Sequence, residues 1–202
     1  MGDTYGPASE HRLARCDLAG GGEAKVALPL AHDRGRRGCV GVVDAEAHVP
    51  EGGTPVWEDP EKAKDLLALA AGVVTRDQYP DRFLQVHLAL FTARHDDGLD
   101  LRVPEVVAGV LDGAGVPGDK VLAEVESGAP VQELRRAHEE AVSRWNVFGV
   151  PTFVVDVRAV FVRLMSRPAG DAALARRTVE GVLSLFDSMP ELNEFKYTTL
   201  DR

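Results

Sequence analysis

The sequence predicts an α/β protein in which a run of helices precedes a β-hairpin and a final helix. Apolar residues recur at three- and four-residue spacing between positions 59 and 146, as in amphipathic helices. Two β-branched runs follow within residues 152–164, and helical spacing returns at residues 171–188. At 202 residues, the chain is long enough for one domain, or for one domain with a large insertion.

The composition bears on partners and location. The formal net charge is −9, and such a surface repels phosphate backbones, so we expect no nucleic-acid partner. No apolar run approaches the roughly 20 residues needed to span a bilayer, so we expect no membrane partner. Residues 1–10 lack the basic start and apolar core of a secretory signal, which makes a cytoplasmic location the expectation.

The first helix of the run has a clear start signal at Asp59, Pro60 and Glu61. Aspartate is a good helix cap, proline suits the first helical position, and an acid is favourable near the positive end of the helix dipole. The apolar face of this helix is expected to contain Leu66, Leu67, Leu69, Ala70 and Val73. Four further helices are expected at about residues 80–94, 104–112, 119–126 and 130–145.

After residue 146 the period changes to that of strands. Thr152–Val155 and Ala159–Leu164 are β-branched and aromatic runs separated by a few residues, which indicates a hairpin. Asp171 can cap a last helix that ends near Ser188. The buried face of this helix is expected to consist of Leu174, Val179, Val182, Leu183 and Phe186.

The first 43 residues differ from the rest because they are rich in glycine and poor in core anchors. Lys25–Ala31 and Cys39–Val43 are the two candidate strands, and Pro29 confines the former to the edge or the end of a sheet.

A Gly-Val-Pro-Thr motif at residues 149–152 lies between the helix ending at Trp145 and the first strand of the hairpin. Taken alone, such a motif only ends a helix and begins a strand. In this context it resembles the second half of the thioredoxin fold in DsbA-like proteins. The resemblance is carried by Val147–Pro168, Glu191–Thr199 and the approach Ala47–Pro60, and it covers residues 45–202.

The resemblance implies a thioredoxin-like fold with a large inserted helical domain. Residues 1–58 then stand in place of the first thioredoxin β-α-β unit, which is expected to be incomplete. Residues 59–146 form the helical domain, residues 147–189 the second thioredoxin half and residues 190–202 a tail. The resemblance also implies a cis bond before Pro151 and a substrate-binding loop made of Val150, Pro151 and Thr152.

The cysteine motif of the family is missing. The family has a strand, then Cys-Pro-x-Cys or Cys-Pro-x-x at a helix start, where the helix N-terminus lowers the thiol pKa. Cys16 and Cys39 are too far apart for a Cys-x-x-Cys pair. Cys16 precedes Asp17 and three glycines, which disfavour a helix and a thiolate, yet it remains the candidate nucleophile. Cys39 falls in a predicted strand, and the active site is expected to be degenerate.

Two explanations of this mismatch remain open. Residues 1–43 are either a diverged segment or the product of a misplaced start or a shifted reading frame. With the first β-α-β unit missing, the hairpin is expected to have an unpaired edge, which is an aggregation hazard.

Three functions are compatible with the resemblance. The first is a thiol–disulfide oxidoreductase, or a glutathione- or mycothiol-type thiol-linked enzyme, acting on a thiol or disulfide substrate, either protein or small molecule. No cofactor is expected other than such a low-molecular-weight thiol. The second is non-catalytic binding of a peptide or small molecule. The third is an isomerase or transferase that uses a thiol cofactor.

Other signals are weaker. His87 and His95 lack a third ligand at matching spacing, and the zincin-like start at His138 lacks a second histidine, so no metal is expected. Four aromatic residues are predicted to belong to the core: Phe91, Trp145, Phe148 and Phe153.

Overall fold

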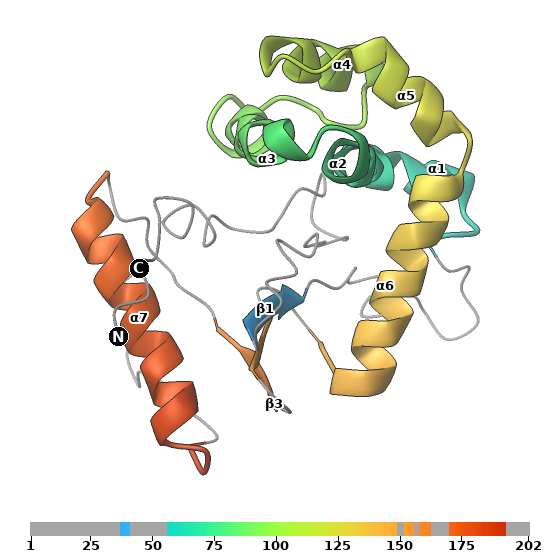
Figure 1. Ribbon diagram of the computed structural model, residues 1–202. Helices are drawn as coiled ribbons and strands as arrows, with labels where there is room; N and C mark the ends of the chain where they lie inside the picture. Colours follow the sequence, from blue (N-terminus) through green and yellow to red (C-terminus); the bar gives the residue numbers. More distant parts are fainter. Residues whose placement is uncertain (1–36, 41–55, 149–151, 156–157, 163–169, 193–202) are drawn as a thin grey trace. The chain divides into compact units, whose positions relative to one another are not determined.

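The computed structural model describes residues 37–40, 56–148, 152–155, 158–162 and 170–192 (Figure 1). The chain divides into two compact units, one of residues Ala14–Arg163 and one of Met1–Leu13 together with Leu164–Arg202. The described part is mostly helical with one small sheet. None of the described helices combines the length and the apolar character needed to cross a membrane.

The first unit contains three strands and a series of helices. In chain order they are β1 (Arg37–Val40), α1 (Pro60–Ala63), the 3₁₀-helix η2 (Lys64–Leu66), α2 (Leu67–Gln78), α3 (Pro80–His95), α4 (Pro104–Gly113), α5 (Gly118–Glu126), α6 (Ala129–Trp145), β2 (Thr152–Val155) and β3 (Arg158–Phe161). The second unit contains α7 (Ala172–Ser188).

The predicted start signal at Asp59 is confirmed. The Asp59 carboxylate accepts a hydrogen bond from the Glu61 backbone N–H at 3.0 Å, and Pro60 occupies the first helical position. The helix predicted from this point is broken, however, because α1 ends at Ala63 and the tighter turn η2 follows before α2. A 3₁₀-helix has 3.0 residues per turn, whereas an α-helix has 3.6. The side chains of α2 therefore point in other directions than they would in one continuous α-helix. Leu66, at the end of this turn, is fully buried.

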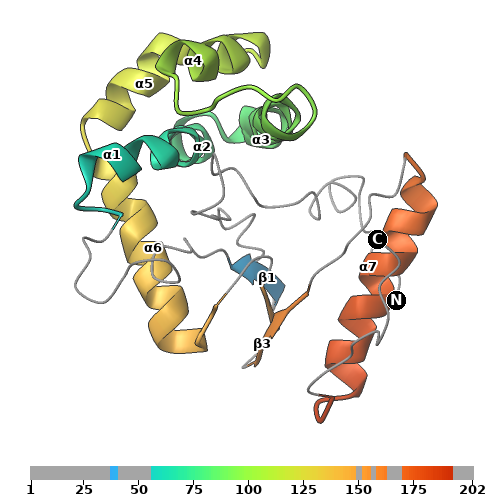
Figure 2. The same cartoon turned by 180° about the vertical axis from the view of Figure 1, so that it is seen from behind.

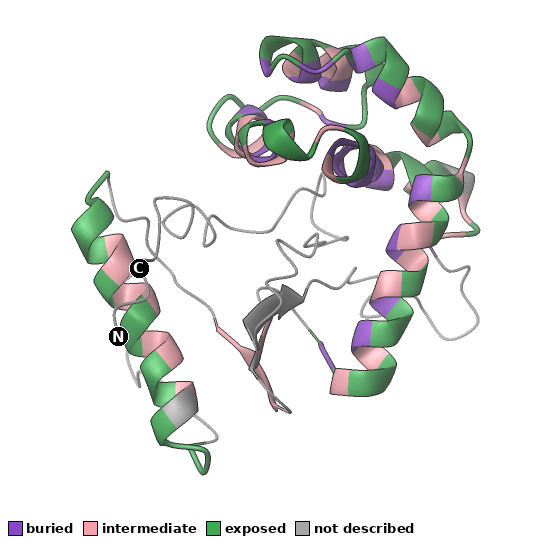
Figure 3. Ribbon diagram, viewed as in Figure 1, coloured by how far each residue is buried: buried purple, intermediate pink, exposed green. Residues whose placement is uncertain are grey.

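Helix α2 is the centre of the helical block. Eight consecutive residues, Ala68–Thr75, are buried, and α2 contacts α3, α5 and α6 (Figures 1 to 3). A helix buried on all sides carries no polar face, and the small side chains of alanine and glycine allow its neighbours to approach closely. The predicted apolar face of this helix therefore contains only some of its buried residues. Within it, Leu67 is half-buried, whereas its other four residues are buried.

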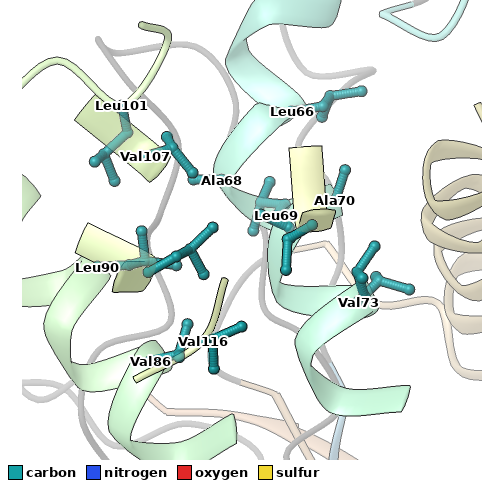
Figure 4. Close-up of a cluster of buried hydrophobic side chains, with 14 of the residues drawn as sticks. Leu66, Ala68, Leu69, Ala70, Val73, Val86, Leu90, Leu101, Val107 and Val116 are labelled. Carbon is teal, nitrogen blue, oxygen red and sulfur yellow. The ribbon is translucent and has the colours of Figure 1, made fainter. Parts of the chain in front are cut away.

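The remaining helices supply the other side of this core. Their bounds agree with the predicted ones to within a residue at each end. Leu90 of α3, Val107 and Leu111 of α4, and Val121 of α5 are all buried. Figure 4 shows Leu90 and Val107 among the clustered side chains of α2 and α3. The hydrophobic cluster also contains Leu134, so it joins the helices from α2 to α6.

A glycine sets the distance between α4 and α5. A Cβ atom at Gly118 would lie 2.5 Å from the backbone oxygen of Ala108. The Gly118 N–H also donates a hydrogen bond of 2.8 Å to the Asp112 carboxylate, which fixes the first turn of α5 against α4. The two helix backbones can approach this closely only because residue 118 has no side chain.

The sheet has three strands in the order β1-β2-β3, with antiparallel pairing throughout. Val40 is paired with Thr152 on one side of β2, and Phe161 is paired with Thr152 on the other. The expected hairpin is confirmed, but β3 begins at Arg158, one residue before the predicted start. The predicted unpaired edge of β2 is wrong, because the segment Arg37–Val40 occupies it.

Helix α7 is described by itself as part of the second unit. The Asp171 carboxylate accepts a hydrogen bond from the Leu174 N–H at 2.8 Å, which confirms the predicted cap, and the helix ends at Ser188 as expected. Its predicted buried face is wrong at Leu174, which is 44% exposed, and the other four residues are half-buried. An apolar face is buried where a second layer covers it. In the described part of this unit, α7 is the one element.

The close approach of α4 and α5 predicts opposite effects for two glycine substitutions. We expect Gly118→Ala to lower the free energy of unfolding by about 1–3 kcal/mol, because the new methyl group must displace the α4 backbone. Gly109→Ala, in the middle of α4, meets nothing within 4 Å and is expected to raise it by about 0.5–1 kcal/mol. Denaturant unfolding of the two variants measures both changes. A loss of stability in both would contradict this account.

Candidate functional site

The end of α6 is fixed by a left-handed residue. Asn146 has φ 51° and ψ 38°, and asparagine adopts this region more readily than most other residues do. Its backbone N–H donates to the Val142 carbonyl at 3.0 Å. Val147 turns back and is buried with Ala141 of α6, beside the half-buried Val142 and Trp145. The chain therefore leaves α6 in a defined direction, four residues before Pro151.

Thr152 begins β2 on the far side of the predicted substrate loop. Its side chain is 3% exposed, and β2 pairs with β1 on one edge and with β3 on the other. The backbone of Thr152–Val155 is therefore engaged within the sheet. Val150 and Pro151, the other two predicted substrate-binding residues, lie outside the described residues. Within the described sheet, β2 therefore offers no free edge with which a further strand could pair.

Phe148 is on the surface rather than in the core. It is 77% exposed, and its ring lies against that of Phe161 in β3, with ring centroids 5.2 Å apart and an interplanar angle of 46°. The core prediction is therefore wrong for Phe148. It is confirmed for Phe91, which is buried, while Trp145 and Phe153 are half-buried. The preceding turn explains the difference, because Val147 takes the inward position after Asn146.

Of the two cysteines, Cys39 lies in the part of the chain that the structure describes and Cys16 does not. Cys16, the candidate nucleophile, lies outside the described residues. Cys39 lies in β1, which confirms the predicted strand in part, and its register partner is Phe153 of β2. A cysteine within a strand has no helix N-terminus to stabilise its thiolate. The sequence after β1 continues Gly41-Val42-Val43-Asp44, without a further cysteine.

The histidines occupy packing positions. His87 of α3 is 2% exposed and lies between Phe83 and Phe91, with ring centroids 5.8 Å and 4.9 Å away. Neither ring nitrogen has a hydrogen-bond partner in the described part of the chain, and burial lowers the pKa of His87 to about 4. His138 of α6 packs against Trp57 at 5.8 Å. Within the described residues, no three potential metal-ligating side chains come together.

Comparison with known proteins gives one family. The family model described as "DSBA-like thioredoxin domain" matches residues 56–166, which is more than half of the chain. The match contains all the helices from α1 to α6 and both strands of the hairpin. No curated protein matches the chain.

The buried, neutral His87 predicts a loss of stability in mild acid. Its pKa is about 4 in the folded chain and about 6.5 in the unfolded one, so the unfolded chain binds more protons between these values. Full stability is therefore present above pH 6.5 and falls as the pH drops toward 4. We expect about 2 kcal/mol to be lost between pH 7.5 and pH 5.

Urea unfolding across this pH range measures the loss. His87→Leu should remove most of the dependence, while His95→Gln, at a half-buried position on the same helix, should retain it. An unchanged pH dependence in His87→Leu would show that other groups cause it.

The left-handed turn at residue 146 predicts a matched pair of effects. Asn146→Val should lower the free energy of unfolding by about 1–2 kcal/mol, because a β-branched residue disfavours positive φ. Asn146→Gly should leave stability nearly unchanged, since glycine adopts this conformation freely. Thermal denaturation of both variants tests the turn. Equal losses would indicate that the asparagine side chain, and not the backbone conformation, is what matters.

Proposed function

Because the chain belongs to the family of DSBA-like thioredoxin domains, we propose that it is a relative of the thiol–disulfide oxidoreductases whose Cys-x-x-Cys site is degenerate or missing. The position of β2 is the observation that supports this best. Thr152 follows Pro151 directly and begins the central strand of the sheet, paired on both sides. The loop of residues 149–151 then corresponds to the proline loop of the family, and Val150, Pro151 and Thr152 are the proposed substrate-binding residues.

The helical block fits the proposed insertion. β1 and β2 are neighbours in the sheet, yet all the helices from α1 to α6 lie between them in the chain. Residues 59–146 are therefore proposed to be a helical domain inserted into a thioredoxin-like fold. Residues 1–58 then stand in place of the first β-α-β unit, and β1 is the strand that they contribute to the described sheet. Residues 147–189 make the second half.

Catalysis would require a reactive thiolate. The proposed substrates are thiols or disulfides, protein or small molecule, with a low-molecular-weight thiol such as glutathione or mycothiol as co-reactant. Cys39 is placed in a strand, which does not lower a thiol pKa, so redox activity would have to come from Cys16. In such a step the Cys16 thiolate attacks one sulfur of a disulfide, forms a mixed disulfide and releases the other sulfur as a thiolate.

Binding without redox chemistry is the second candidate, and one observation favours it. In the family the cysteine motif follows a strand, whereas the strand paired with β2 here is followed by Gly41-Val42-Val43-Asp44. The proline loop and the inserted helices would then bind a peptide or a small molecule.

Reaction with oxidised glutathione separates the two candidates. We expect the wild-type chain, if catalytic, to form a stoichiometric mixed disulfide within minutes, detected as intact mass, and to reduce insulin disulfides. Cys16→Ser should abolish both, while the matched control Cys39→Ser retains them. Equal rates in wild type and Cys16→Ser would reject catalysis by Cys16. Absence of any adduct in the wild type would leave binding as the function.

A further inference from the structure

We propose that α3 is an acid-sensitive element of the helical block, which detaches from α2 when His87 takes up a proton, while α2, α5 and α6 stay packed together. Detachment of α3 uncovers apolar surface of α2 that is buried at neutral pH. The inference is independent of the proposed function, because it concerns only the helices of the first unit.

The surroundings of His87 are the first observation. Four rings follow one another along α3 at four-residue spacing: Phe83, His87, Phe91 and His95. Their successive centroids are 5.8, 4.9 and 5.5 Å apart. His87 is 2% exposed, and neither of its ring nitrogens has a hydrogen-bond partner in the described part of the chain. An imidazolium donates from both nitrogens, so a proton on this ring leaves a buried charge and two donors unsatisfied.

The charged groups of the neighbouring helices do not offset this cost. Among the described helices, α3 packs mainly against α2 and α4. The charged and titratable side chains are Arg76 and Asp77 on α2, Glu105 and Asp112 on α4, and Asp81, Arg82, Arg94 and His95 on α3 itself. None of these side chains is buried, and burial is what lowers the pKa of His87 to about 4. Acid therefore favours any arrangement in which this ring reaches water.

The second observation is that α3 can leave without dismantling the other helices. Each of α2, α5 and α6 contacts the other two, and α3 and α6 lie on opposite sides of α2 (Figures 1 and 2). Helix α4 stays attached to α5, because the Gly118 N–H donates to the Asp112 carboxylate across these two helices. The contacts among α2, α5 and α6 therefore remain when α3 is removed.

The third observation concerns the two ends of α3. Tyr79, with φ −131° and ψ 53°, is the one residue between α2 and α3, and Pro80 has no N–H with which to continue the hydrogen bonds of α2. Beyond the other end, Gly98 has φ 70° and open space around it. Because both connections are non-helical, α3 can move while the backbone hydrogen bonds of α2 and α4 stay formed.

The open state is a minor one at neutral pH. Val86, Leu90 and Phe91 of α3 are buried, and their packing holds the helix in place. Protonation of His87 raises the population of the open state without adding a contact to it. With a pKa of about 4 in the closed state and about 6.5 in the open one, this population rises about 30-fold between pH 7.5 and pH 5.

Hydrogen exchange of the full chain, followed by mass spectrometry at these two pH values, tests the inference. A detached helix of 16 residues is only marginally stable in water, so its amides exchange. After correction for intrinsic exchange, we expect the protection of α3 to fall about 30-fold from pH 7.5 to pH 5. At pH 5 the amides of α6 should remain at least about tenfold better protected than those of α3, as for an opening that spares α6.

Three variants show whether His87 causes the change. His87→Leu should abolish the fall in protection of α3. His87→Gln is also neutral at both pH values and should give the same result, which keeps the test valid if the leucine variant does not fold. His95→Gln, at the half-buried end of the same row of rings, should keep the full fall.

Three results would overturn the inference. The first is a fall of less than about threefold in the wild type, and the second is an undiminished fall in the His87 variants. The third is equal protection of α3 and α6 at pH 5, because the helical block would then unfold as a whole.

Discussion

The burial of α2 on all sides is the constraint on which the helical block depends. A helix can be surrounded only if its side chains are small enough for several neighbours to approach at once, and Ala68–Thr75 contains three alanines and one glycine. The neighbours α3, α5 and α6 pack around this segment (Figure 1). The positions of these neighbouring helices are therefore defined by their packing against α2.

This constraint extends to the candidate site through α6. Leu134 of α6 is buried in the same cluster as α2, and the Arg76 guanidinium lies 3.9 Å from the Glu133 carboxylate across the two helices. The ion pair is partly exposed and contributes little, so packing is the main interaction between them. At its other end α6 leads through Asn146 to the loop before β2. The helical block thus fixes one end of the proposed substrate loop, and the sheet fixes the other.

Much of the fold could be predicted because its signals are local. The cap at Asp59, Pro60 at the first helical position and the cap at Asp171 each act within one helical turn, and each is confirmed. Two features were missed because apolar periodicity does not reveal them. The pairing of Arg37–Val40 with β2 joins segments far apart in the chain, and periodicity does not reveal strand partners. The exposure of Phe148 follows the turn at Asn146, after which Val147 is buried against α6 and the next side chain is exposed.

The separation of β1 from β2 in the chain also has a consequence for folding. Closing this pair of strands orders a loop that contains the entire helical block, and such long-range closure is slow compared with the formation of local helix contacts. Until β1 has paired with it, one edge of β2 exposes unpaired backbone N–H and C=O groups to other unfolded chains. Once residues 37–40 have paired with β2, they occupy the edge of the hairpin at which another chain could add a strand. A short strand from the glycine-rich N-terminal part therefore protects the hairpin from intermolecular association.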